Sequence, residues 1–241
     1  MALLEVSGLV RRFRGLAAVD RLSFRVAEGQ TVAIIGPNGA GKSTTFNLVS
    51  GLLGVDGGTI RFRGADVTRS PAHSRTRAGI GRTFQVVQPF VDLNVMDNVI
   101  VGALFGASAS LGAARADANR LIELVGLGDK RFSGVSALTL ADRKRLELAR
   151  ALATKPVLLM LDEVMEGLTP TEERDAVRLL SDVRAEGVTL LLIEHVMSTV
   201  RDLSDHVLVM DYGKKLAEGS YEEVAHDPKV IEAYLGTDTE A

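Results

Sequence analysis

The 241-residue sequence has no cysteine, which excludes disulfide bonds and metal–thiolate sites and fits a reducing compartment such as the cytoplasm. No apolar run approaches the roughly 18 residues that a membrane-spanning helix needs. Residues 1–6 lack a basic segment followed by an apolar one, so no signal peptide is expected. Lysine and arginine number 28 against 31 acidic residues, which argues against a nucleic-acid partner.

The sequence does have enough apolar residues, 46%, to fill the core of a large α/β domain. Short apolar runs predict strands at Leu3–Val6, Leu22–Val26, Thr31–Ile35, Thr59–Phe62, Val157–Leu161 and Thr189–Ile193. The last two runs are continuous, as in strands buried on both faces of a parallel sheet. Val207–Met210 and Lys215–Ala217, joined through Gly213, predict a hairpin. Residues 92–153 instead show helical spacing.

The most informative segment follows the run Thr31–Ile35 and matches the pattern G-x-x-x-x-G-K-[ST]. Its candidate nucleotide-binding residues are Gly36, Pro37, Asn38, Gly39, Ala40, Gly41, Lys42, Ser43, Thr44 and Thr45. A helix is predicted from Lys42 to Leu53. Strand, glycine loop and helix in this order indicate a P-loop that binds a nucleoside triphosphate, rather than a merely flexible turn.

The residue types of this loop fit phosphate chemistry. Glycines let successive backbone N–H groups turn toward phosphate oxygens at a helix N-terminus, whose dipole favours anions. Lys42 is expected to reach the β- and γ-phosphates as a catalytic contact, and the Ser43 hydroxyl is expected to take a Mg²⁺ position. ATP and Mg²⁺ are therefore the expected ligands.

Two other apolar runs end in acidic or basic side chains suited to the same reaction. Asp162 and Glu163 follow the run that ends at Leu161, which is the Walker B pattern. Asp162 would hold Mg²⁺ and Glu163 would act as general base, although two solvated acids are the plain alternative. His195 follows the next run and would contact the γ-phosphate or link it to Glu163, although most lone histidines are structural or solvated.

With these residues in place, the whole chain resembles the ATP-binding subunit of an ABC transporter. The resemblance implies a nucleotide-binding core with an antiparallel β subdomain over 1–91 and 154–241, and a helical signature subdomain over 92–153. It assigns Phe13 to adenine stacking and Gln85 to a catalytic position that touches Mg²⁺ and relays to the membrane subunit. Apolar residues after Gln85 (Val86, Val87, Pro89 and Phe90) form a candidate docking surface, part of which is expected to be ordinary core.

The resemblance also implies partners and a location. The expected partners are a second ABC ATPase subunit, identical or different, and transmembrane permeases at the cytoplasmic face of the membrane. A solute-binding protein outside the cytoplasm would act indirectly, and no nucleic acid is expected.

Three segments are similar to the branched-chain amino acid importers: Gly79–Gln85, Arg145–Leu152 and Asp227–Gly236. Related importers serve urea, amides or aromatic acids, and none of these residues touches the solute. The alternatives are an ABC system for lipid or lipopolysaccharide export, a soluble ABC ATPase acting on DNA or ribosomes, and a nucleotide-binding regulator with little turnover.

The signature sequence departs from the family pattern Leu-Ser-Gly-Gly-Gln. Here Leu138 is followed by Thr139, Leu140, Ala141 and Asp142, the residues expected to meet the nucleotide of the opposite subunit. Thr139 is predicted to cap a helix with Asp142 at the third helical position. Ala141 adds a methyl group, and the Asp142 carboxylate would repel phosphate unless it turns back onto its own helix.

Further departures follow in the next loop and helix. Val164 stands where proline is common, and Thr169 where an acid or amide is expected. These changes indicate either neutral drift or a slow, weakly dimerising site. The basic stretch from Arg143 to Arg150 is predicted to be a solvated helix face in which Glu147 pairs with Arg143 and with Arg150.

Overall fold

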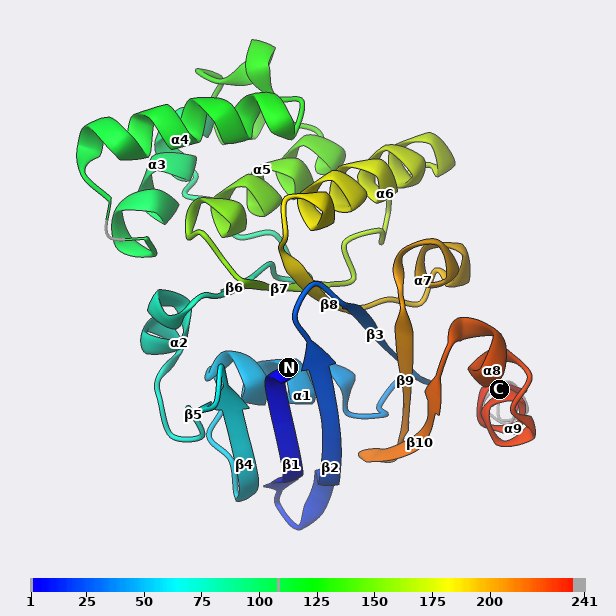
Figure 1. The fold of residues 1–241 in the computed structure, drawn as a ribbon. Helices are drawn as coiled ribbons and strands as arrows, with labels where there is room; N and C mark the ends of the chain where they lie inside the picture. The colour runs from blue at the N-terminus through cyan, green and yellow to red at the C-terminus, as the bar shows by residue number, and fades with distance from the viewer. Residues whose placement is uncertain (1, 108, 236–241) are drawn as a thin grey trace. The chain divides into compact units, whose positions relative to one another are not determined.

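The computed structural model describes residues 2–107 and 109–235, which fall into two compact units (Figure 1). The first unit comprises Met1–Ala72 and Thr189–Ala241, and the second comprises His73–Val188. Residues 92–153 lie within the second unit, although the subdomain boundaries predicted from the sequence stay a prediction. Gly236, the last residue of the third importer-like segment, lies outside the described residues.

The first unit contains an antiparallel sheet in the order β2-β1-β4-β5. Its strands are β1 (Ala2–Phe13), β2 (Leu16–Ala27), β4 (Gly57–Phe62) and β5 (Ala65–Asp66). β1 and β2 extend well beyond the apolar runs predicted from the sequence. Pairing carries β1 through Arg11 and Arg12, which oppose Val19 and Ala17. The predicted antiparallel subdomain is thus confirmed, with longer strands.

The first unit also contains parallel strands that lead to the phosphate loop. β3 (Thr31–Ile35) lies between β8 (Thr189–Ile193) and β9 (His206–Asp211), parallel to both. Every residue of β3 and β8 is buried, as their continuous apolar sequences predict. β10 (Lys214–Gly219) pairs antiparallel with β9, which confirms the predicted hairpin.

Helices complete the first unit. They are α1 (Lys42–Ser50), α7 (Met197–Leu203), α8 (Tyr221–Ala225) and α9 (Pro228–Leu235). α1 ends three residues before the predicted Leu53 because Gly51 takes a left-handed conformation with φ 79°. The Gly51 N–H then donates to carbonyl groups of the last helical turn.

The second unit is mainly helical (Figure 1). Its helices are α2 (Ala72–Ala78, which starts at the boundary), α3 (Val95–Phe105), α4 (Leu111–Leu124), α5 (Leu140–Ala153) and α6 (Pro170–Ala185), with short 3₁₀ turns at Gly128–Lys130 and Val135–Ala137. α3, α4 and α5 pack together. β6 (Ile80–Arg82) and β7 (Leu158–Asp162) pair in parallel. Across the described ranges, no helix combines the length and apolarity needed to cross a bilayer.

A close backbone approach at Gly58 in the antiparallel sheet yields a stability prediction. Gly58 has φ 85°, and a Cβ atom there would lie 2.4 Å from the Gly8 carbonyl oxygen. We expect Gly58→Ala to lower the free energy of unfolding by about 2 kcal/mol or more. Gly64→Ala is the matched control because Gly64 has φ 77° with open space around it, so only the backbone penalty of about 1 kcal/mol applies. Equal urea midpoints for the two variants would contradict the packing argument.

Candidate functional site

The phosphate loop of the first unit contains three glycines with positive φ angles, which other residues rarely adopt. Gly36, Gly39 and Gly41 have φ values of 146°, 80° and 96°. A Cβ atom at Gly36 would lie 2.1 Å from the Met210 carbonyl oxygen, and one at Gly41 would lie 2.3 Å from that of Ala18. The loop therefore packs directly on the backbone of neighbouring strands and takes a conformation that L side chains rarely adopt.

Lys42 lies at the centre of this loop and is 8% exposed. Its Nζ donates to the carbonyl oxygens of Gly36 at 2.7 Å and Pro37 at 3.0 Å. Ser43 is exposed, whereas the buried Thr45 donates its hydroxyl to the Gly41 carbonyl at 3.0 Å. In the described part of the loop and helix, no side chain caps the N-terminus of α1. Backbone N–H groups and an ammonium thus meet at a positive helix end, which suits a phosphate.

Two other predicted residues of the first unit are accessible. Phe13, at the end of β1, is 43% exposed, and the Arg11 guanidinium carbon lies 4.9 Å from its ring centroid. His195 is exposed directly after β8, next to the buried Glu194. An exposed ring at a strand end is compatible with stacking on a base.

Sequence reasoning missed a contact between the C-terminal helix and the phosphate loop. Burial raises the pKa of the Tyr234 hydroxyl in α9, and a hydrogen bond with the Gly36 backbone opposes this shift. Nothing in the local sequence signals this contact, because the two residues lie near opposite ends of the chain.

In the second unit, the Walker B aspartate forms a buried ion pair. Asp162 is the last residue of β7 and is 3% exposed. Arg82 Nη2 donates to its Oδ2 at 2.8 Å, and the Asp162 N–H donates to the Thr83 hydroxyl at 3.3 Å. Burial lowers the pKa of Arg82, while the Asp162 charge opposes that shift. Arg82 had not been predicted from the sequence, although it precedes Gln85 in the motif.

The predicted glutamine and general base are in direct contact. Gln85 Nε2 donates to Glu163 Oε2 at 2.7 Å. Glu163 adopts a left-handed backbone conformation with φ 49°, which is uncommon for a residue other than glycine. The side-chain amide of Gln85 therefore fixes the orientation of the carboxylate.

The segment after Gln85 is attached to α5 by two charged residues. Glu147, which is 5% exposed, accepts from the Gln88 N–H at 3.2 Å. Arg150 donates to the Gln88 carbonyl at 2.7 Å and lies 3.5 Å from the Glu147 carboxylate. Burial raises the pKa of Glu147, although Arg150 and backbone N–H groups oppose the shift.

The Glu147–Arg150 pair confirms one of the two predicted pairings. The predicted solvated helix face is wrong, because Glu147 is buried and the basic residues Arg143, Lys144, Arg145 and Arg150 are only partly exposed. Glu147 is buried under the loop after Gln85, where its carboxylate accepts from the Gln88 N–H. The apolar side chains of that loop lie largely at the surface, with Val86 at 71% and Phe90 at 45% exposure. Val87 and Pro89 are half-buried.

The altered signature segment begins α5 as predicted. Thr139 is the N-cap of this helix and forms a capping box with Asp142. The Thr139 N–H donates to the Asp142 carboxylate at 3.0 Å, and the Asp142 N–H donates to the Thr139 hydroxyl at 3.2 Å. Lys130 Nζ also donates to the same Asp142 oxygen at 2.8 Å. Burial raises the pKa of Asp142, but the bonds from Lys130 and Thr139 outweigh it and leave the pKa below its usual value. The carboxylate therefore turns back onto its own helix.

Comparison with known families agrees with this geometry. Residues 19–166 match the family described as ABC transporter. Residues 214–240 match the family described as branched-chain amino acid ATP-binding cassette transporter.

Individual relatives match along almost their whole length. The chain is 42% identical to the high-affinity branched-chain amino acid transport ATP-binding protein BraF of Pseudomonas aeruginosa, over 97% of this chain and 98% of that protein. It is 37% identical to LivG of Escherichia coli K12, which has the same description, with the same shares covered.

Solved structures show the same fold. A nucleotide-free ATP-binding cassette from an ABC transporter superposes with a TM-score of 0.89 at 31% identity, over 97% of this chain and 99% of the other. The ADP conformation of the ATP-binding cassette MJ1267 gives a TM-score of 0.89 at 31% identity, over 98% of this chain and 99% of that chain. The predicted α/β P-loop fold of the ABC type is thereby confirmed.

The Lys130–Asp142 pair gives a pH-dependent prediction. We expect Lys130→Met to lower the free energy of unfolding by about 1 kcal/mol at pH 7. Because the folded-state pKa of Asp142 lies below its unfolded value of about 3.9, the pair stabilises the fold above that pH and loses its effect as pH falls further. Urea unfolding at several pH values measures this difference.

Asp142→Asn supplies the control for this pair. In the Asp142→Asn background, Lys130→Met is expected to leave the free energy of unfolding almost unchanged at any pH. An equal cost in both backgrounds would show that Lys130 acts through some other contact.

Proposed function

The chain belongs to the ABC transporter family as an ATP-hydrolysing subunit, and from this premise we propose that it energises import of branched-chain or related amino acids. The observation that carries the solute class is the match of residues 214–240 to the branched-chain amino acid cassette family. The near full-length identity with BraF supports the same class.

ATP binding is proposed for the loop Gly36–Thr45. A Cβ atom at Gly36 or Gly41 would collide with backbone carbonyl oxygens, so the loop keeps the bare backbone that a phosphate needs. Lys42 would shift contacts from the loop carbonyls to the β- and γ-phosphate oxygens. The accessible ring of Phe13 would stack on adenine.

The proposed Mg²⁺ donors are the Ser43 hydroxyl, the Gln85 amide oxygen and the Asp162 carboxylate. All three are hard oxygen donors, which is the set that Mg²⁺ prefers. When bound, the ion would offset charge on the β- and γ-phosphate oxygens. Arg82 would orient the Asp162 carboxylate, since its guanidinium lies 2.8 Å from Oδ2.

Hydrolysis is proposed to use Glu163 as general base. The attacking water would form a bond to the γ-phosphorus, the bond from that phosphorus to the bridging oxygen would break, and Glu163 would accept the water proton. Gln85 aims the carboxylate through the 2.7 Å hydrogen bond. His195 would contact the γ-phosphate from the end of β8.

The partner proposal is a second ABC ATPase subunit, either a second copy or a sister chain. Its nucleotide would face the segment Thr139–Asp142 of this chain. Because the Asp142 carboxylate is bound by Lys130 and by the Thr139 N–H, it would not point its charge at that nucleotide. This geometry favours neutral drift of the signature sequence over a slow site.

Coupling to transport is proposed to run through the surface residues Val86 and Phe90, next to Gln85. Exposed apolar side chains of this kind suit a cytoplasmic helix of a permease. The subunit would thus lie at the cytoplasmic face of the membrane, and a solute-binding protein would act on it only through the permeases.

The base assignment gives a direct kinetic prediction. We expect Glu163→Gln to lower the rate of ATP hydrolysis by at least about 10²-fold, because proton transfer is lost. The dissociation constant for Mg·ATP should change by less than about threefold, since the amide keeps the shape of the side chain. Phosphate release and calorimetric titration measure the two quantities.

Glu166→Gln is the matched control, because Glu166 is an exposed acid three positions along the same loop. It should leave both quantities unchanged. Equal losses in the two variants would remove Glu163 from the base role.

The solute class is tested in a strain from which the gene is deleted. ATP-dependent uptake of radiolabelled leucine, isoleucine and valine should fall to background and return with the intact gene but not with Glu163→Gln. Loss of urea or phenylalanine uptake instead would move the proposal to the related solute, and loss of an export activity would overturn import.

A further inference from the structure

The backbone of Glu163 is held in a conformation that it would not favour alone. Its φ of 49° lies in the left-handed region, where the side chain of a residue other than glycine meets steric strain. Such strain persists only where surrounding contacts impose it, and it often marks functional residues. The Gln85 bond restrains the carboxylate but not the backbone of this residue.

Lys144 supplies a restraint on the backbone itself. From α5, its Nζ donates to the carbonyl oxygens of Glu163 and Val164, each at 3.1 Å. The Glu166 N–H also bonds the Glu163 carbonyl, at 3.3 Å, but it belongs to the same turn. Lys144 therefore ties the turn to a separate helix.

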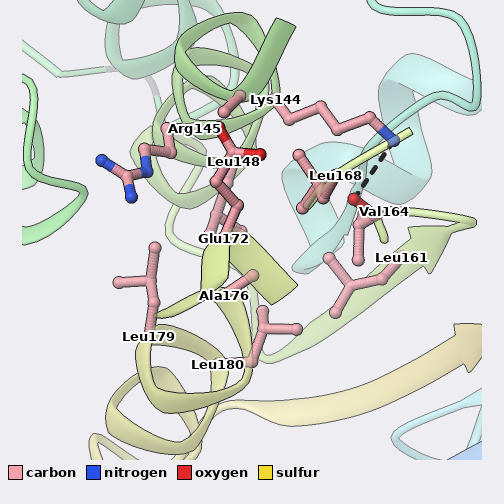
Figure 2. A pocket seen from close by; sticks show the side chains of 11 residues that line it. Lys144, Arg145, Leu148, Leu161, Val164, Leu168, Glu172, Ala176, Leu179 and Leu180 are labelled. Carbon is pink, nitrogen blue, oxygen red and sulfur yellow. Dashed lines mark hydrogen bonds between the residues drawn. The ribbon is translucent and has the colours of Figure 1, made fainter. Parts of the chain in front are cut away.

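The surroundings of Lys144 favour this geometry. The residue lines a small cavity of about 40 Å³ between α5, α6 and the loop after β7, together with Leu148, Leu161, Val164 and Leu168. In Figure 2 the Lys144 side chain extends past Leu168 and its Nζ meets the Val164 carbonyl. The apolar side chains beside the ammonium lower the local dielectric, which strengthens its bonds to the carbonyl groups.

Charged side chains also lie around this cavity. Arg145 and Glu172 line the same cavity, and the Arg145 guanidinium lies 3.9 Å from the Asp175 carboxylate. The Glu172 carboxylate accepts from the Thr169 N–H at 2.8 Å in its own capping box. Glu172 and Asp175 therefore each have a partner other than Lys144.

We propose that Lys144 is a positioning residue for the general base. It fixes the left-handed backbone of Glu163, so that the carboxylate meets Gln85 and the attacking water in one orientation. Because Lys144 lies two residues after the signature segment Thr139–Asp142, it also links the start of α5 to the base. This inference rests on the proposed role of Glu163.

The test compares Lys144→Met, which keeps the aliphatic stem but removes the donor, with the wild type in full-length protein. We expect kcat for ATP hydrolysis to fall about tenfold, as for a small misplacement of a catalytic group. The dissociation constant for Mg·ATP should stay within about twofold, because the substitution leaves the residues of the loop Gly36–Thr45 themselves unchanged. Lys144→Arg should keep at least half of the wild-type kcat by restoring a donor.

Lys155→Met is the matched control. Lys155 follows α5, is 60% exposed and pairs with Asp117 at 2.8 Å, away from the Glu163 turn. Its kcat should equal that of the wild type. Should Lys144→Met fail to fold, Lys144→Gln offers a shorter donor with a smaller expected loss.

A second measurement separates positioning from general damage. In the Glu163→Gln background, Lys144→Met should cause no further loss of the residual rate, since the group that it positions is already gone. An unchanged kcat in Lys144→Met, a full additional loss in the double variant, or parallel losses of kcat and ATP binding would each overturn the inference. A wild-type protein without ATPase activity, or a fully active Glu163→Gln, would instead overturn the proposed function.

Discussion

The phosphate loop depends on the direct contact of its backbone with neighbouring strands. At Gly36 and Gly41 the nearest carbonyl oxygens leave no room for a Cβ atom, and the backbone takes angles that favour glycine. This packing turns the loop around the Lys42 ammonium at the start of α1. The buried strand β3 and its neighbours β8 and β9 form the rigid base that makes such a close approach possible.

In the second unit, α5 has the corresponding organising role. Asp142 closes its first turn with Thr139, Lys144 holds the carbonyl groups of the Glu163 turn, and Glu147 with Arg150 holds the loop that follows Gln85. The bond between Gln85 and Glu163 thus joins two loops that one helix supports. These contacts give a physical reason for the charged residues along α5.

The sequence predicted those parts whose signal is local. β3 and β8 match their predicted bounds because both are continuous apolar runs, and the capping box at Thr139 follows from residue types at fixed spacing. β1 and β2 were predicted too short because their outer parts, residues 7–13 and 16–21, contain consecutive charged residues that interrupt both an apolar run and a regular alternation. The sequence did not predict that Arg82 pairs with Asp162, that Lys144 bonds the Glu163 carbonyl, or that Glu147 is buried. These features depend on tertiary neighbours that no local pattern encodes.

We propose that ATP bound by the loop Gly36–Thr45 carries a Mg²⁺ ion for which Asp162 is a ligand. The most direct measurement is the affinity for ATP with and without Mg²⁺, in the wild type and in Asp162→Asn. We expect Mg²⁺ to lower the dissociation constant for ATP in the wild type. In Asp162→Asn this lowering should be at least about tenfold smaller, as for loss of a metal-site group. The affinity without Mg²⁺ should be unchanged. An equal effect of Mg²⁺ in both proteins would contradict the account.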